Sequence, residues 1–405
     1  MEILKEKTKS ICPQCFQELD ARVIQDNNSV FLEKECPQHG RFKILIEKDA
    51  EFYKRLMHKE FRKEKIPFKQ LALPVTYQCN LHCPMCYEPD RESKEVSIEK
   101  FTTTIKEFSG NLVKITGGEP TLRKDLPILI KMAKEQGKEP TLCSNCVKLA
   151  NMKYVKMLKK AGIKQVAVAF SGFRDDIYEK INGQRLLKEK LKAIKNLKKA
   201  GIDVILSVTL VRGVNENELG KIYRYYLNNK SFIQQLRIRS MSYIGRYIDA
   251  EPFCLSEIIE LLSKASGFDK NELIEPFFQY GDYNPHSFHR FPYYSSTCRF
   301  RIDLFTSFIH RIYKKGNQNK RFRRIRFILE SLSLFGIKRT VEMVINKLKG
   351  KKRLLDAKIE IRVWPDKERI DLGEIQWCYT ALLSKEGKLL PFCYAIIMDE
   401  KRYSL

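Results

Sequence analysis

Three cysteines lie within eight residues of one another, at Cys79, Cys83 and Cys86, with three and then two residues between them. Thiolates at this spacing can converge on one metal centre, and soft sulfur ligands select zinc, copper(I) or iron–sulfur clusters. Three ligands are one short of a closed tetrahedral site, which favours an iron left open to a ligand that is not protein. The alternative is a zinc site that His82 or a distant residue completes.

Two further ligand pairs stand near the N-terminus, Cys12 with Cys15 and Cys36 with His39. The chain between them predicts a β-hairpin over residues 22–32. Two such knuckles flanking a hairpin are typical of a zinc ribbon or a rubredoxin-like site, with tetrahedral ligation of Zn or a mononuclear Fe. We predict that these four side chains bind one structural metal. A histidine that precedes a glycine also suits a simple turn, so His39 has this second interpretation.

Residues 67–246 alternate between short apolar runs and amphipathic segments, a pattern that predicts an α/β fold with a parallel sheet covered on both faces. Six strand–helix units argue for a partial (βα)6 TIM-like barrel. A small metal-binding domain over residues 1–66 would precede it, and an α+β C-terminal extension over residues 247–405 would follow. The expected strands span residues 71–76, 112–116, 140–142, 165–170, 204–211 and 235–241, and the expected helices residues 98–108, 124–136, 154–161, 187–200 and 216–227.

Sites in parallel α/β folds lie at the carboxyl ends of the strands, so we expect residues that follow the strands to converge on one mouth. Two glycines after a strand would let the backbone approach a ligand closely, and a glutamate beside them offers an acceptor for an ammonium group. The same run also suits a tight turn. Besides the cysteine loop, the residues concerned are Gly117, Gly118, Glu119, Pro120, Ser144 and Asn145.

The cysteine loop with Tyr87 after it, together with the run from Gly117 to Pro120, resembles the signature of the radical S-adenosylmethionine (SAM) superfamily. The resemblance implies that Cys79, Cys83 and Cys86 hold a [4Fe–4S] cluster whose fourth iron binds the amino and carboxylate groups of SAM. In that family, reductive cleavage of the SAM C–S bond gives a 5′-deoxyadenosyl radical that abstracts hydrogen.

The same resemblance implies further contacts to SAM. The Gly-Gly-Glu-Pro run would bind its methionine amino group, and Tyr87 would lie near its adenine. Ser144 and Asn145 stand where the family often has Thr-Asn-Gly contacts to the cofactor, but the third position here is Cys146. With Cys143 it forms another Cys-x2-Cys pair, which suits either extra metal ligation or two core thiols.

Several stretches narrow the resemblance to an archaeal branch that contains tetraether lipid synthase and the pterin-methylating proteins. They are the N-terminal knuckles, residues 212–220 and two C-terminal stretches at residues 377–380 and 387–393. Members of this branch carry auxiliary iron–sulfur clusters, and Cys298, Cys378 and Cys393 stand where such ligands would lie. Residues 285–296 lack the cysteines expected there, so one auxiliary cluster at most is predicted.

The resemblance implies C–C bond formation or methylation on a lipid alkyl chain or a small molecule. A reductant such as ferredoxin or flavodoxin would be a partner. Two other readings stay open at this point: an RNA-modifying radical SAM enzyme, and a non-catalytic iron–sulfur protein that binds nucleic acid. The Gly-Gly-Glu-Pro run argues against the second, because a non-catalytic carrier has no use for a methionine-binding loop.

Composition points to a cytoplasmic or membrane-peripheral protein. The chain of 405 residues shows no signal peptide and no run of 18 apolar residues, and its twelve clustered cysteines suit metal chemistry in a reducing compartment. The net charge of +26 predicts attraction to a polyanion, either nucleic acid or an anionic membrane surface. A solvated, lysine-rich surface is the plain alternative.

Much of this charge lies between residues 307 and 353, which contain fifteen Lys or Arg and two acidic residues. A basic amphipathic helix is typical of a segment that lies on an anionic membrane. Its alternatives are a core-facing helix with a solvated back, and a surface that grips RNA phosphates with the help of Tyr313 and Phe322. We rank lipid above RNA, since the sequence shows no recognisable RNA-binding module. The apolar residues at helical spacing are Ile325, Ile328, Leu329, Leu332, Phe335, Val341, Val344, Ile345 and Leu348.

Overall fold

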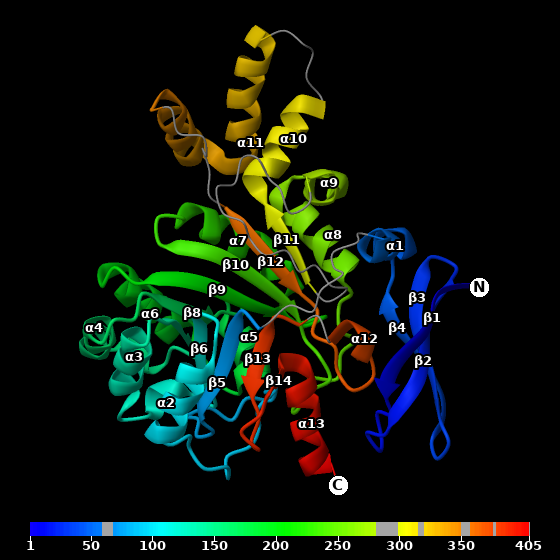
Figure 1. Ribbon diagram of the computed structural model, residues 1–405. Helices are drawn as coiled ribbons and strands as arrows, with labels where there is room; N and C mark the ends of the chain where they lie inside the picture. Colours follow the sequence, from blue (N-terminus) through cyan, green and yellow to red (C-terminus); the bar gives the residue numbers. More distant parts are fainter. Residues whose placement is uncertain (59–67, 281–298, 315–319, 350–356, 376–377, 405) are drawn as a thin grey trace.

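The computed structural model describes residues 1–58, 68–280, 299–314, 320–349, 357–375 and 378–404 (Figure 1). The N-terminal part is a four-stranded antiparallel sheet in the order β1-β2-β3-β4, followed by helix α1. The predicted hairpin is confirmed as β2 and β3, whose register joins Asp26 to Ser29 at the turn. These elements are β1 (Glu2–Ile11), β2 (Glu18–Asp26), β3 (Ser29–Cys36), β4 (Gly40–Glu47) and α1 (Ala50–His58).

The six predicted strands of the barrel are all present, and they lie side by side in chain order with parallel pairing. Strands β8 and β9 are mostly apolar, whereas polar and apolar residues are mixed in β6, β7 and β10. The parallel pairing of all six confirms the α/β prediction. The strands are β5 (Gln70–Thr76), β6 (Leu112–Gly117), β7 (Glu139–Ser144), β8 (Gln165–Ala169), β9 (Asp203–Leu210) and β10 (Ile233–Ser240).

Strands from the C-terminal part extend this sheet on both sides, to ten strands in all. Strand β12 (Lys358–Arg362) pairs in parallel with β10 and carries β11 (Arg299–Asp303) outside it. On the other side, β13 (Thr380–Leu383) pairs in parallel with β5 and carries β14 (Leu389–Pro391). Described residues of the predicted C-terminal extension therefore share one sheet with the predicted barrel.

Helices pack on this sheet around one large apolar core. The predicted helices are present, with α5 as an addition, and α4 and α6 are each followed by a glycine of positive φ, Gly162 and Gly201, as C-terminal caps require. No helix of the described residues is long and apolar enough to cross a membrane. The helices are α2 (Ile98–Glu107), α3 (Leu126–Glu135), α4 (Met152–Lys160), α5 (Asp175–Asn182), α6 (Leu187–Lys199), α7 (Leu219–Asn228), α8 (Leu255–Ser266), α9 (Lys270–Tyr280), α10 (Leu304–Lys314), α11 (Lys320–Leu348), α12 (Leu372–Ile375) and α13 (Phe392–Ser404).

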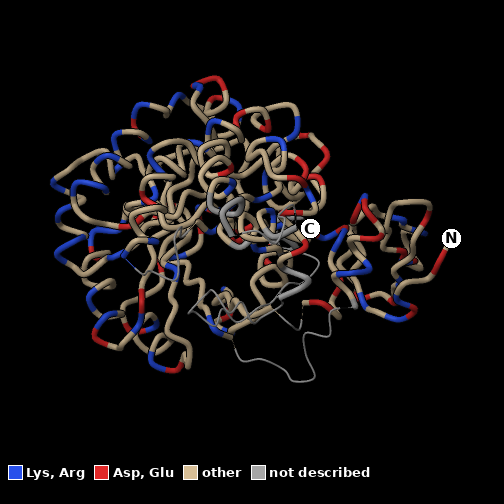
Figure 2. The backbone as a smooth tube through the Cα atoms, turned by 90° about the horizontal axis from the view of Figure 1, so that it is seen from above, with Lys and Arg blue, Asp and Glu red and all other residues tan. Residues whose placement is uncertain are grey.

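Helices α10 and α11 project from the rest of the molecule, on the side away from β5 and α2 (Figure 1). Helix α11 bends at Gly336, which has φ 75° and ψ 172°. Viewed from above, Lys and Arg are spread around the periphery of the main body rather than gathered in one patch (Figure 2). The basic charge is therefore a property of much of the described surface as well as of this projecting segment.

Candidate active site

The cysteine loop follows β5 and is held from two sides. Cys86 exchanges two backbone hydrogen bonds with Arg246, of 2.7 and 2.9 Å, and so pairs with the chain after β10. The Met85 amide donates to the Ile181 carbonyl at the end of α5. Gly245 is required by this packing, because a Cβ there would lie 2.4 Å from the Cys86 carbonyl oxygen. The loop is thus a fixed element.

Each thiol of the loop receives an N–H donor from a different side chain. The amide of Asn145 lies 3.9 Å from Cys79 Sγ, and the amide of Asn182 lies 3.3 Å from Cys83 Sγ. The Arg91 guanidinium lies 3.8 Å from Cys86 Sγ. Donors of this kind stabilise thiolates and tune the potential of an iron–sulfur cluster.

Burial dominates the titration of two thiols of the loop. It raises the pKa of Cys79 and of Cys83. A bound metal centre would stabilise the thiolate forms that burial disfavours. The assignment of the three cysteines to an iron–sulfur cluster stays a prediction.

The two glycines after β6 are required by contact with the cysteine loop. A Cβ on Gly117 would lie 2.1 Å from the Thr76 carbonyl oxygen, and one on Gly118 would lie 2.4 Å from that of Gln78. The amides of Gly118 and Glu119 donate to these same two carbonyls, each at 2.8 Å. We predicted that these glycines let the backbone approach a ligand closely. The structure shows that they let it approach the loop that carries the cysteines.

Glu119 is buried, and its carboxylate joins two strand ends. Its Oε1 accepts hydrogen bonds from the backbone N–H and hydroxyl of Thr121 and from the Ser144 hydroxyl. Its Oε2 accepts one from the backbone N–H of Asn145 at 2.6 Å. Pro120 follows it in a buried turn of 3₁₀-helix. The carboxylate thus sets the positions of Ser144 and Asn145, while its role toward the SAM amino group stays a prediction.

Cys146 occupies the position where glycine was expected, and its backbone adopts the conformation that glycine favours, with φ 70°. The side chain is fully buried, and burial raises the pKa of the thiol to about 12. Its Sγ contacts the Ser144 carbonyl at 3.3 Å. Cys146 is therefore a core thiol, whereas Cys143 lines a cavity.

Lys190 on α6 is a buried residue of this site that sequence reasoning missed. It is 1% exposed, and its Nζ donates to the Asn145 carbonyl at 2.7 Å. Burial lowers its pKa, while the nearby Cys146 thiol and Glu119 carboxylate oppose that shift. The lysine braces the strand end whose Asn145 side chain contacts both Cys79 and Asn80.

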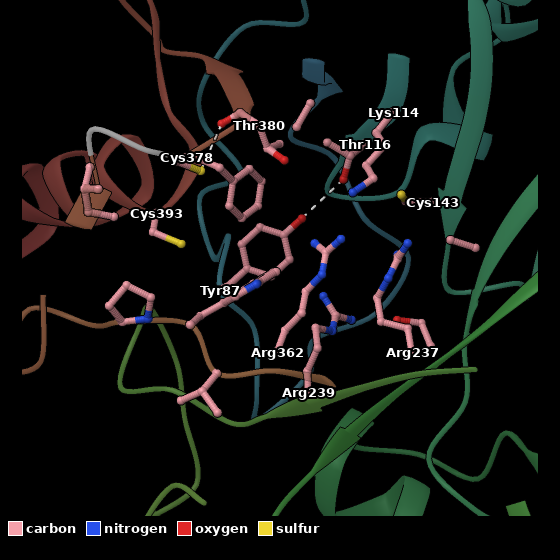
Figure 3. Close-up of a pocket in the computed structure, with 18 of the residues that line it drawn as sticks. Tyr87, Lys114, Thr116, Cys143, Arg237, Arg239, Arg362, Cys378, Thr380 and Cys393 are labelled. Carbon is pink, nitrogen blue, oxygen red and sulfur yellow. Dashed lines mark hydrogen bonds between the residues drawn. The ribbon is translucent and has the colours of Figure 1, made fainter. Parts of the chain in front are cut away.

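A cavity of about 320 Å³ opens beside these residues (Figure 3). Tyr87 lines it and is held by a 3.2 Å hydrogen bond between its hydroxyl and Thr116, and by edge-on contact with Trp364. Gly117, Gly118, Ser144 and Asn145 line it as well. Five of the predicted SAM contacts therefore line one space, whereas Glu119 and Pro120 are not among its lining residues.

The candidates for an auxiliary cluster are partly placed by the structure. Cys378 and Cys393 both line the cavity, and Figure 3 shows them together on the side of Tyr87, with Cys143 on the opposite side. Cys298 lies outside the described residues. The auxiliary cluster stays a prediction, with two of its proposed ligands facing the same space.

The N-terminal ligand set comes together as predicted. The ligand atoms of Cys12, Cys15, Cys36 and His39 all lie within 4.8 Å of one another, which fits one tetrahedral Zn or Fe ion. Both knuckles stand at the same end of the sheet, because β2 begins after the first and β3 ends at the second.

The N-terminal sheet also forms part of the cavity wall. Lys5 pairs with Asp371 at 2.9 Å, and the buried Lys34 donates to the Glu368 carbonyl at 2.7 Å. Asp371 lines the cavity, as do Leu32 and two other residues of the N-terminal part. The metal-binding domain is therefore placed to influence the shape of the site.

Comparisons with known proteins agree with this architecture. Residues 73–226 match the model of the radical SAM superfamily, and residues 4–48 match that of the HMPTM N-terminal zinc ribbon domain. The chain thus contains a radical SAM domain preceded by a zinc ribbon, as its motifs indicated.

Individual relatives are particular enzymes rather than whole families. The 7,8-dihydro-6-hydroxymethylpterin dimethyltransferase of Methanocaldococcus jannaschii is 35% identical over 276 residues, which cover 60% of this chain and 54% of that protein. The probable GTP 3′,8-cyclase of Aeropyrum pernix is 32% identical over 172 residues, covering 39% and 47%. This chain thus spans about half the length of these two relatives. Streptococcus suis SuiB aligns with a TM-score of 0.44 at 18% identity, over 54% of this chain and 50% of SuiB.

Gly117→Ala should lower the free energy of unfolding by about 2–4 kcal/mol, because it adds a steric clash to an unfavourable φ. Chemical denaturation measures this. Gly137→Ala is the matched control, since Gly137 has φ 69° and no neighbour within 4 Å of its Cβ position. Equal losses in the two variants would show that packing against the cysteine loop contributes nothing.

Cys12→Ser should release one metal ion and lower the melting temperature, while the visible spectrum of the cluster stays intact, because a closed structural site contributes folding energy rather than chemistry. Metal analysis, calorimetry and absorbance measure the three effects. Cys254→Ser, at the buried thiol that immediately precedes α8 and lies outside both sites, should retain both metals. Parallel loss of the cluster spectrum in Cys12→Ser would show that the two centres form one unit.

Proposed function

We propose that this protein is a radical SAM enzyme that binds a [4Fe–4S] cluster through Cys79, Cys83 and Cys86 and acts on a substrate in the adjoining cavity. The observation that carries the proposal is the position of Asn145, whose side chain contacts Cys79 Sγ and which also lines the cavity. The cluster site and the substrate space therefore meet at one residue. Bound there, the cluster would supply the electron for reductive cleavage of SAM.

The described residues have distinct parts in this proposal. Asn145, Asn182 and Arg91 donate to the three cysteine sulfurs. These donors would stabilise the negative charge of the thiolates that hold the cluster. Tyr87 and Trp364 form an aromatic wall that excludes water from the reacting carbon. The loop contacts hold this arrangement rigid, as radical chemistry on an unactivated carbon requires.

Methylation is the outcome that best agrees with the comparisons, because the relative from M. jannaschii is named as a pterin dimethyltransferase. C–C bond formation on a lipid alkyl chain is the second candidate, and the exposed apolar surface described below favours it. A small reductant of the ferredoxin or flavodoxin type would deliver electrons in either case.

Cys83→Ala should abolish both cluster absorbance and formation of 5′-deoxyadenosine from SAM by anaerobically reconstituted protein with a strong reductant. The loss follows because two thiolates cannot hold the cluster in the way that three can. Liquid chromatography of the nucleoside product measures it. A Cys83→Ala protein that kept both signals would overturn the cluster assignment, and Cys254→Ser should keep both.

We also propose that α11 rests on an anionic membrane surface. Its exposed residues include eight large apolar side chains, with exposed fractions from 38% at Leu332 to 82% at Leu348. The opposite face is buried, and Phe335, which the sequence pattern placed with the exposed stripe, belongs to that buried face at 5% exposure. The eight residues are Ile325, Ile328, Leu329, Leu332, Ile337, Val341, Ile345 and Leu348.

Charge and position support a lipid occupant. The segment carries fifteen basic and two acidic residues between positions 307 and 353, and both acidic residues are paired, Glu330 with Arg311 and Glu342 with Arg339. The helix projects from the body, where a flat surface can reach it (Figure 1). Apolar insertion combined with basic flanks is the pattern of an interfacial helix.

Leu332→Asp should weaken binding to phosphatidylglycerol-containing vesicles by tenfold or more, since it removes an inserting side chain and adds a charge. Ser333→Asp adds the same charge at the neighbouring exposed position and should cost much less. Vesicle co-sedimentation at two salt concentrations measures both, and binding should weaken with salt.

Ile328→Asp combined with Leu332→Asp should abolish vesicle binding without unfolding the protein, because both side chains are exposed. If the double variant bound vesicles normally, the membrane proposal would be wrong. Loss of RNA binding alone would point to nucleic acid, and loss of self-association alone would point to a second copy of the chain.

A further inference from the structure

One wall of the cavity carries four cationic side chains from three strands. Two of these strands, β10 and β12, are neighbours, and the third, β6, lies farther along the same sheet. Lys114 comes from β6, Arg237 and Arg239 from β10, and Arg362 from the end of β12. Figure 3 shows all four on the side of the cavity away from Cys378 and Cys393, with Lys114 beside Thr116. These residues belong to no motif singled out by the sequence.

A single buried carboxylate, that of Glu360, serves part of this set. It pairs with Arg237 at 3.0 Å, Arg362 at 3.0 Å and Arg301 at 3.5 Å. Burial would raise its pKa, but Arg362 and Arg237 outweigh that effect and bring it to about 2, so it is ionised. One negative charge is shared by three guanidinium groups.

Lys114 and Arg239 have no such partner. Lys114 is 8% exposed, and among the described residues it makes no hydrogen bond or ion pair, although the Cys143 and Glu360 charges act on it from farther away. The buried Nε of Arg239 is also without an acceptor there, and its guanidinium lies 4.9 Å from the centre of the Trp364 ring. Buried cations without a hydrogen-bonded counter-ion cost free energy, so an arrangement that places two of them together favours an anionic ligand.

The electrostatics of the empty cavity agree with this geometry. Burial, and then the charges of Arg362 and Arg237, lower the pKa of Lys114 well below its usual value. Burial followed by Arg237 likewise lowers that of Arg239, to about 10. An anion bound between them would oppose both shifts.

We propose that this wall binds a phosphate group of the substrate, with Lys114 and Arg239 as its direct partners and Arg237 and Arg362 completing the positive field. Two unpartnered cations match the double charge of a phosphate ester, and arginine offers the fork geometry that phosphate oxygens accept. The inference rests on the proposed function in taking the phosphate to be part of the substrate of the SAM-dependent reaction.

Binding to the full-length, anaerobically reconstituted protein tests the proposal without turnover. Inorganic pyrophosphate, glycerol phosphate and monomeric dihexanoyl phosphatidic acid are titrated by calorimetry, and the last two distinguish a soluble ester from a lipid headgroup. Lys114→Met and Arg239→Met should each weaken binding of the preferred probe at least tenfold. Lys131→Met, at a position with 73% side-chain exposure on α3, should bind like the wild type.

Thermal unfolding separates this role from a structural one. Removing an uncompensated buried charge should leave the melting temperature of Lys114→Met unchanged or raised, whereas a structural lysine would give a lower one. A lowered melting temperature with unchanged probe affinity would overturn the proposal. So would weaker SAM binding with unchanged pyrophosphate binding, because the wall would then belong to the cofactor. Failure of the wild type to bind any of the three probes would overturn it as well.

The result is distinguishable from failure of the proposed function. If the wild type cleaves no SAM but binds pyrophosphate through Lys114, the phosphate site stands and the radical chemistry falls. If it cleaves SAM normally and Lys114→Met changes no probe affinity, the chemistry stands and the phosphate site falls.

Discussion

The contact on which the site depends is the one between the Gly117–Glu119 backbone and the start of the cysteine loop. Two backbone hydrogen bonds of 2.8 Å and the absence of two Cβ atoms bring these chains together. The buried Glu119 carboxylate then carries the constraint one strand further, to Ser144 and Asn145. The Asn145 side chain in turn contacts Cys79 Sγ, which links this strand end back to the cysteine loop. Three strand ends thus form a closed ring of contacts around the predicted cluster.

The rest of the molecule completes the cavity beside this ring. The C-terminal strands β12 and β13 extend opposite sides of the sheet, and the chain between them supplies Trp364 and Asp371 to the cavity wall. The N-terminal sheet packs on the same segment through Lys5 and Lys34. The small N-terminal sheet therefore packs against the same segment with which it encloses the cavity.

The sequence allowed the fold and the metal ligands to be predicted because both leave local signals. Six apolar runs separated by amphipathic segments predicted β5 to β10, and short cysteine spacings predicted the N-terminal set. Asn182, Lys190 and Lys114 could not be found in this way. Each is a single polar residue within an ordinary helix or strand, and only the folded chain shows that it reaches a sulfur, a strand end or a cavity.

Two residues of the site depart from the backbone conformation or the environment that their residue type prefers. Cys146 adopts a left-handed conformation that a cysteine avoids, and Lys114 is buried without a hydrogen bond or ion pair among the described residues. Each departure costs free energy that the continuous apolar core must offset. The Cys146 side chain fills space that glycine would leave empty, and this packing offsets part of the cost of its backbone conformation. Lys114 has no such compensation in the described chain, and this difference is why the lysine, rather than the cysteine, points to a ligand.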